Sequence, residues 1–210
     1  MPDYIAHIDP DDRRENAQVD ALLRQEGIRR DQNLDYTCGI FDEDGDLLAT
    51  GSCFGNTIRC LAVSDRCQGQ GLLNRILSHL LEIQAARGKT HLFLYTKPAS
   101  AKYLSDLGFY EIARVPGKLV FMENRKDGFS RYCQALTQGP QAGKIAAIVM
   151  NANPFTLGHL HLVERAAREN DAVHLFVLSE EAGPIPFAVR RHLVQEGTAH
   201  LSNAILQDSG

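Results

Sequence analysis

The sequence has no excess of positive charge. Its 210 residues include 22 Lys and Arg against 26 Asp and Glu, which gives a formal net charge of −4. Nucleic acids and anionic membrane surfaces attract proteins through clustered positive charge. This charge balance therefore argues against both, and we expect no nucleic acid and no membrane among the partners.

Cysteine is scarce, with five residues, no C-x-x-C pair and no grouping with histidine that would suit a metal. His, Asp and Glu do not cluster at ligand spacing either, and the acidic residues 42–46 are typical of a solvated turn. We therefore predict no metal site. Unpaired thiols in odd number favour a reduced, cytoplasmic protein.

An export signal and a long apolar run are also missing. The first seven residues lack the basic and then apolar stretch of a signal peptide, and no run of about 18 apolar residues occurs. A cytoplasmic location is again expected. The composition, 44% hydrophobic and 23% charged, is globular and allows one large domain or two small ones.

Residues 1–124 have the pattern of a mixed domain of strands and helices. Asp44-Gly45 suits a hairpin turn that needs positive φ, and Gly88 is a suitable helix end. The predicted helices span 16–28, 71–87 and 98–107, and the predicted strands span 36–41, 47–54, 57–63, 90–96, 109–115 and 118–123.

Residues 125–143 are rich in turn formers and predict a linker, and the hydrophobic pattern of the sequence is different after them. A continuous apolar run at 144–150 is typical of a strand covered on both faces. Predicted elements then follow in β-α-β-α order: a helix at 158–169, a strand at 172–178, a helix at 187–197 and the start of a strand at 204–206. The fold class is therefore α/β, with an α+β domain at 1–124, the linker, and the opening of a Rossmann-like parallel sheet at 144–210.

The first motif is the segment from Arg66 to Leu72, which has the form R-x-x-G-x-G-L at a strand-to-helix junction. Free N–H groups of a first helical turn can face a phosphate there, and glycines let the main chain approach the anion. A tight turn would use the same letters, so these residues alone leave both interpretations open.

With the strand at 60–63 before it, a long helix after it and the later segment 101–109, this motif resembles the GNAT acyltransferases over residues 1 to about 124. In that family the glycine loop holds the pyrophosphate of coenzyme A and the preceding strand pairs with the pantetheine arm. The resemblance implies a coenzyme A or pantetheine site lined by Ala62, Val63, Gln68, Gly69, Gln70, Gly71 and Leu72.

One position departs from the GNAT pattern. Many members carry a tyrosine general acid where this sequence has Leu104, and the adjacent Tyr103 is turned by about 100° around the helix. A leucine cannot protonate a leaving thiolate, and we expect Tyr103 to pack in the core. The domain is thus expected to bind a coenzyme A-like group without being an acetyltransferase.

The second motif, from Asn151 to His159, follows a strand of buried type and opens a helix. Its residues 156–159 resemble the T/H-x-G-H motif of the nucleotidylyltransferases, whose histidine stabilises charge on the α-phosphate during adenylyl transfer. His161 is expected to be structural or exposed. The resemblance implies catalytic roles for His159 and Thr156 and an ATP site of Asn151, Asn153, Phe155, Thr156 and His159.

The longer string 151–159, with 172–178 and 190–197, resembles the citrate lyase ligases specifically, and with the GNAT-like front this likeness covers nearly the whole chain. Met150 and Asn153 depart from the wider nucleotidylyltransferase pattern but fit the ligase version. A second motif of the I-S-S/A-T-x-x-R kind holds ATP phosphates in these enzymes and is absent. We therefore expect a truncated chain.

The resemblance implies an enzyme that forms acetyl-AMP from ATP and acetate, with Mg²⁺ arriving on the ATP. The acetyl group then passes to the phosphoribosyl-dephospho-coenzyme A thiol on the acyl carrier (gamma) subunit of citrate lyase, which activates that enzyme. Three alternatives stay open. They are an acetyl-coenzyme A-dependent acetyltransferase, a non-catalytic module that binds coenzyme A or the carrier, and an adenylyltransferase acting on a phosphopantetheine.

Overall fold

The computed structural model describes residues 4–136, 139, 143–180 and 183–208. The chain divides into two compact units, Met1–Phe129 and Ser130–Gly210, which are described separately. The division falls inside the segment predicted as a linker. Residues 137–138 and 140–142 of that segment lie outside the described residues.

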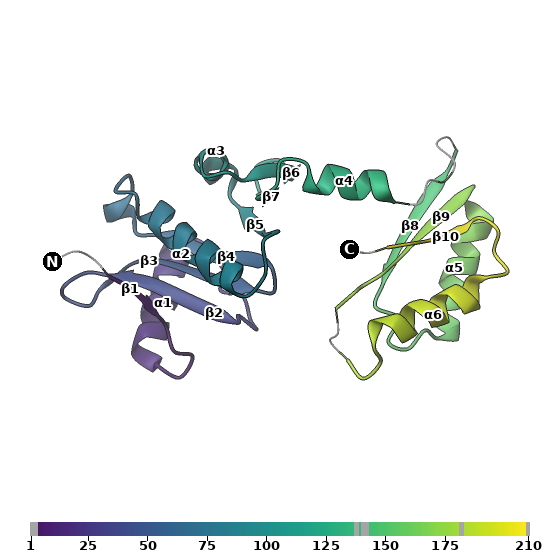
Figure 1. Cartoon of the computed structure of the whole chain (residues 1–210), viewed down its shortest axis with the longest axis horizontal. Coiled ribbons are helices and arrows are strands. Elements are labelled where there is room, and N and C mark those ends of the chain that lie inside the picture. Colours follow the sequence, from purple (N-terminus) through teal and green to yellow (C-terminus); the bar gives the residue numbers. More distant parts are fainter. Residues whose placement is uncertain (1–3, 137–138, 140–142, 181–182, 209–210) are drawn as a thin grey trace. The chain divides into compact units, whose positions relative to one another are not determined.

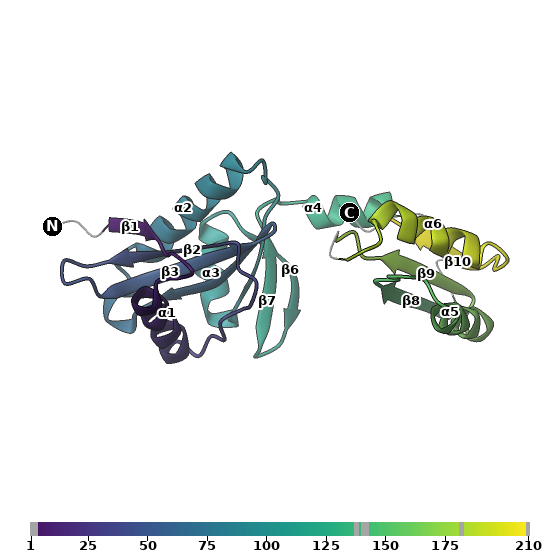
Figure 2. The same cartoon turned by 90° about the horizontal axis from the view of Figure 1, so that it is seen from below.

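The first unit is a seven-stranded sheet in the order β1-β2-β3-β4-β5-β7-β6. Helices α1 and α2 lie on opposite faces of it, as Figures 1 and 2 show. The strands are β1 Tyr4–His7, β2 Tyr36–Phe41, β3 Leu47–Phe54, β4 Thr57–Val63, β5 Phe93–Thr96, β6 Tyr110–Val115 and β7 Leu119–Glu123, and the helices are α1 Arg13–Gln25, α2 Leu72–Ala86 and α3 Pro98–Asp106, with a 3-10 turn at Asp65–Cys67.

Local sequence explains most of these bounds. Helix α1 begins three residues before the predicted start because the Asp12 side chain accepts a hydrogen bond from the N–H of Glu15 and so caps the helix. The β2–β3 hairpin turns at Gly45 with φ +78°, and α2 is followed by Gly88 with φ +76°. Both glycine predictions are confirmed, since side chains rarely adopt this backbone region.

Strands β4 and β5 run parallel but pair only at their beginnings, where Thr57 faces Phe93 and Ile58 faces Leu94. Cys60 has φ +52°, and the pairing of β4 with β3 slips in register at this level. Such an irregularity bends a strand and disrupts its ladder. Beyond Ile58 no further residue pairs between the two strands are found in the described sheet, which leaves room for a cleft.

Two elements of this part of the chain were not predicted. Strand β1 has four residues and pairs antiparallel with β2, from Tyr4 opposite Phe41 to His7 opposite Cys38. Helix α4, Gly128–Ala135, lies in the segment predicted as a linker. A four-residue strand is too short for its alternation to be recognised, and α4 has only eight residues and lies in a segment rich in turn formers.

The second unit has three parallel strands in the order β10-β9-β8, namely β8 Ile145–Met150, β9 Ala172–Val177 and β10 Ala204–Gln207. Helices α5 Leu157–Glu169 and α6 Phe187–Thr198 cover one face (Figure 1). Val163 of α5 and Val194 of α6 pack there against Val173, Leu175 and Val177 of β9. The α/β class and the predicted β-α-β-α-β order are confirmed.

The other face of this sheet is open along β8. Ile145 and Val149 are 45% and 65% exposed there, whereas Met150, with the opposite side-chain direction, is buried. Parallel strands usually have both faces covered. The prediction that residues 144–150 form a strand is confirmed, but the expectation that both of its faces are covered is not met by the described residues.

All five cysteines are free thiols, of which only Cys133 is exposed. Across the residues that the structure describes, no helix is both long enough and apolar enough to span a bilayer.

Candidate functional site

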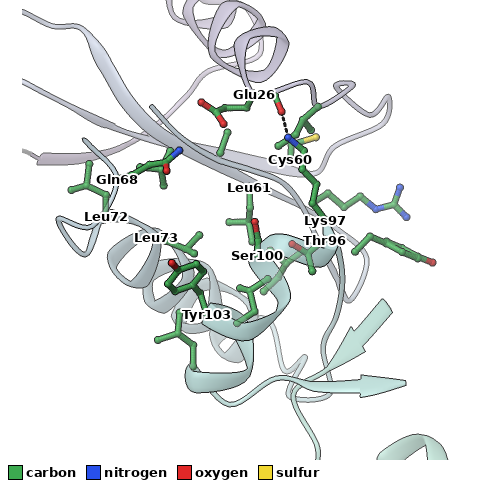
Figure 3. A pocket seen from close by; sticks show the side chains of 18 of the residues that line it. Glu26, Cys60, Leu61, Gln68, Leu72, Leu73, Thr96, Lys97, Ser100 and Tyr103 are labelled. Atoms are coloured by element: carbon green, nitrogen blue, oxygen red, sulfur yellow. Dashed lines mark hydrogen bonds between the residues drawn. The ribbon is translucent and has the colours of Figure 1, made fainter. Parts of the chain in front are cut away.

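The cleft between the diverging ends of β4 and β5 has a volume of about 740 Å³. Figure 3 shows side chains from β4, α2 and α3 on its walls. All residues of β4 from Ile58 to Val63 line it, although alternate residues point to opposite faces of a sheet. The cleft therefore reaches both faces, and its size suits a small-molecule or cofactor site.

The glycine loop lies at the α2 end of this cleft. Gly69 and Gly71 have φ values of +79° and +77°, and a Cβ atom added to either would meet nothing within 4 Å. No side chain caps the first turn of α2. The N–H groups of this turn thus have no side-chain cap and lie next to a loop with open space around it, which suits binding of an anion.

The predicted coenzyme A residues occupy this region with one exception. Gln68 lines the cleft and is held in place by a 2.6 Å hydrogen bond from its Nε2 to Oδ1 of Asp65. Gln70 is exposed and does not line the cleft. The residues of the predicted set that line it are Ala62, Val63, Gln68, Gly69, Gly71 and Leu72.

Tyr103 and Leu104 point in different directions from α3. Leu104 is 2% exposed, belongs to the core and touches the floor of the cleft, whereas Tyr103 is 65% exposed and lines the cleft with its ring accessible to solvent (Figure 3). The expectation that Tyr103 packs in the core is wrong. The 100° step between neighbours in a helix, which seemed to remove the tyrosine from the site, instead places it on the cleft wall.

Lys97 was not predicted as a site residue. It precedes α3, and its Nζ donates to the carbonyl oxygen of Glu26 at the end of α1, as Figure 3 shows. Both residues line the cleft. An ammonium group at the carbonyl end of a helix is a favourable arrangement, and here it ties two walls of the cleft together.

The second motif lies between the carboxyl end of β8 and the start of α5. Thr156 is the N-cap of α5, and its backbone N–H donates to Nδ1 of His159 over 3.1 Å. The Thr156 hydroxyl oxygen is 2.8 Å from the same nitrogen. A backbone N–H can only donate, so Nδ1 is unprotonated and the neutral imidazole has its hydrogen on Nε2. His159 is therefore prepared to donate from Nε2.

The neighbouring side chains complete a donor surface. The Phe155 ring stacks on His159 with centroids 5.8 Å apart. Asn151 accepts a 2.8 Å hydrogen bond at Oδ1 from Arg190, which leaves its Nδ2 hydrogens for another partner. A Cβ on Gly158 would have only the Thr156 hydroxyl within 4 Å, at 3.6 Å, so the helix start is open. These groups fit an anion such as a nucleotide phosphate.

Asn153 of the same motif is less accessible. The Asn153–Pro154 peptide bond is cis, and Oδ1 of Asn153 is buried without a hydrogen-bond partner among the described residues. His161 is exposed, as expected. Arg190, which organises the site, was missed because two adjacent arginines in a helix are typical of a solvated surface.

Solved structures with similar folds include an aminoglycoside 6'-N-acetyltransferase complexed with coenzyme A. It is 14% identical with a TM-score of 0.49, and the match covers 57% of this chain and 95% of that one. Another is a GNAT family N-acetyltransferase from Escherichia coli in complex with coenzyme A, which is 20% identical with a TM-score of 0.45 and covers 60% and 84% of the two chains.

Sequence comparison finds closer relatives. The family model described as the citrate lyase ligase C-terminal domain matches residues 145–210. Citrate pro-3S-lyase ligases of Klebsiella pneumoniae and of Escherichia coli K12 are 37% and 34% identical over 196 and 203 residues, which is 93% and 95% of this chain. The chain spans 57% and 56% of the length of these relatives. It is therefore a homologue of the citrate lyase ligases over nearly all of its residues.

Proposed function

We propose that this chain takes part in the ATP-dependent acetylation of the thiol prosthetic group of citrate lyase. The observation that supports this most is the hydrogen bond from Thr156 N–H to His159, which leaves Nε2 as a donor at the open start of α5. Residues 144–210 are assigned to nucleotide chemistry, residues 1–124 to the prosthetic group and 125–143 to the connection.

In the first half-reaction, a carboxylate oxygen of acetate attacks the α-phosphorus of ATP and pyrophosphate leaves, which gives acetyl-AMP. The role of His159 is to donate from Nε2 to the oxygens on which negative charge gathers, with Asn151 and Thr156 ordering the loop. Such catalysis depends on positioning and electrostatics, so no nucleophile from the protein is required. Mg²⁺ is expected to enter with ATP.

In the second half-reaction, the thiol sulfur attacks the acetyl carbonyl carbon, AMP leaves and the thiol proton is lost. The prosthetic group is a phosphoribosyl-dephospho-coenzyme A on the acyl carrier subunit. Its pantetheine arm fits the cleft beside Ala62 and Val63, and its pyrophosphate fits the uncapped turn at Gly69 and Gly71. The donors there are backbone N–H groups, which can bind a diphosphate whatever group is attached to it.

A second function is favoured by Tyr103, whose exposed side chain lines the cleft. A phenol beside a bound thioester could protonate a leaving thiolate. The first unit would then act as an acetyl-coenzyme A-dependent acetyltransferase.

The test is acetate-dependent exchange between ATP and labelled pyrophosphate, measured on this chain and on the protein at the length of its relatives. We expect ATP–pyrophosphate exchange only when acetate is present. We also expect acetyl-AMP to be recovered when the reaction is quenched. A dinucleotide formed from phosphopantetheine and ATP would identify an adenylyltransferase instead. Absence of exchange from both proteins would overturn the proposal.

A further inference from the structure

Arg190 is a buried cation beside the second motif. Its residue is 1% exposed, although α6 otherwise presents much of its surface to solvent. Burying a charge is costly unless its hydrogen-bonding groups are satisfied. The position therefore calls for a specific set of partners.

Those partners belong to three separate segments. Nη1 donates to the carbonyl oxygen of Asn151 over 2.7 Å and to that of Leu178 over 2.9 Å. Nη2 donates to the carbonyl oxygen of Glu180 over 2.6 Å, and Nε donates to that of Ile185 over 3.0 Å. One guanidinium thus joins the carboxyl ends of β8 and β9 and the residues before α6.

The contact with the Asn151 side chain has a direction. Nη1 also lies 2.8 Å from Oδ1 of Asn151, so that its two hydrogens serve three acceptors and one of them is shared, and an arginine can only donate. The amide oxygen must therefore face Arg190, and the two Nδ2 hydrogens face away from it. Without this contact, either end of the amide could face a ligand, and its oxygen would repel a phosphate.

The acceptors described for Arg190 are all neutral, namely backbone carbonyls and one amide oxygen. No described partner cancels its charge. A positive charge at the carboxyl ends of parallel strands favours an anion at the same edge of the sheet.

We propose that Arg190 is a positioning residue that fixes the Asn151 amide as a hydrogen-bond donor to a nucleotide phosphate. This inference rests on the proposed function, because it takes the anion to be the phosphate chain of ATP. It assigns to Arg190 no contact with the nucleotide. A residue that only supports the fold would affect binding of the phosphates and of the nucleoside alike. The proposed positioning role affects binding of the phosphates and leaves binding of the nucleoside unchanged.

Calorimetric titration with MgATP and with adenosine separates the two roles. Asn151→Asp keeps an oxygen for Arg190 and places a second oxygen where the amide hydrogens were. We expect its MgATP affinity to fall about tenfold or more, the scale of a lost charge-assisted hydrogen bond, and its adenosine affinity to stay within about twofold. Arg190→Lys, which cannot reach all three segments, should show the same selective loss.

The matched control is Arg191→Lys, since Arg191 pairs with the exposed Asp208 over 2.9 Å, and it should bind both ligands as the wild type does. Equal losses of MgATP and adenosine in the folded Arg190→Lys protein would show a structural role only and overturn the proposal. If that variant does not fold, Asn151→Asp decides, and unchanged MgATP affinity overturns it. Selective losses without acetate-dependent exchange would leave the positioning role standing while the proposed reaction fails.

Discussion

The backbone N–H of Thr156 lies 3.1 Å from Nδ1 of His159 and donates to it. Thr156 is the N-cap of α5, and the side chain of His159, at the third helical position, accepts from its backbone N–H. In a capping box this accepting side chain is usually a glutamate. Here the cap also orients the ring. The hydrogen bond from Thr156 N–H to Nδ1 caps the helix and also leaves Nε2 as the donor of the neutral imidazole.

His159→Ala should therefore slow acetate-dependent ATP–pyrophosphate exchange by about 10²–10³, the usual cost of losing one donor to transition-state charge. ATP affinity should change much less, because the donor acts mainly on charge that develops during the reaction. His161→Ala, at an exposed position of the same helix, is the control. Equal effects of the two substitutions on exchange would contradict the assignment.

Gly71→Glu should weaken binding of coenzyme A to the first unit at least about tenfold, because a side chain and its charge would stand at the phosphate-binding turn. Gly88→Glu is a matched control. It lies just past the other end of α2, has φ +76° against +77° for Gly71, and also has open space around its Cβ position. Both variants should lose similar stability, since both force a side chain into the left-handed region. Calorimetry should then find coenzyme A affinity lowered only by Gly71→Glu.

Tyr103→Phe removes one hydroxyl from the cleft wall. If the first unit only presents the prosthetic group, acetyl transfer to the carrier subunit should stay within a few-fold of the wild-type rate. A loss of about a hundredfold is the scale of lost acid catalysis and would favour the acetyltransferase alternative. Initial rates with the loaded carrier protein make the distinction.

The buried thiols predict an alkaline limit to stability. Burial raises the pKa of Cys38 to about 12, with a smaller contribution from Cys53, and burial likewise raises the pKa of Cys53 to about 12. In the unfolded chain these thiols ionise near pH 9, so the free energy of unfolding should fall as pH rises from 9 toward 12. The expected loss is roughly 1 kcal/mol per pH unit for each thiol.

Urea unfolding between pH 8 and pH 11 measures this loss. Cys38→Ala should reduce the slope of stability against pH, whereas Cys133→Ala should not, because Cys133 is exposed. Identical slopes in all three proteins would show that these thiols do not couple folding to pH.

Local chemistry was enough to predict much of the fold. The turn at Gly45 and the end of α2 follow from residues that favour particular backbone angles. The parallel order of the second unit follows from one apolar run succeeded by helical spacing. These features depend on neighbours in sequence, which is why they could be predicted without coordinates.

Features that depend on distant contacts could not be predicted in this way. Arg190 is buried because carbonyl groups from three segments converge on it. The exposure of Tyr103 depends on how α3 packs, with Leu104 turned inward. The glycine loop and the Thr156–His159 motif were found because their chemistry is local. Arg190 entered the sequence analysis only as part of the string 190–197, and nothing in that string indicates its contact with Asn151.

The open face of β8 also affects how the protein is handled. Ile145 and Val149 present apolar side chains to water on an edge strand, a combination that favours pairing between molecules. A net charge of −4 gives only modest repulsion to oppose it. Light scattering of concentrated samples should detect self-association, and Val149→Lys should suppress it, which would make that variant the better starting point for crystals and for NMR.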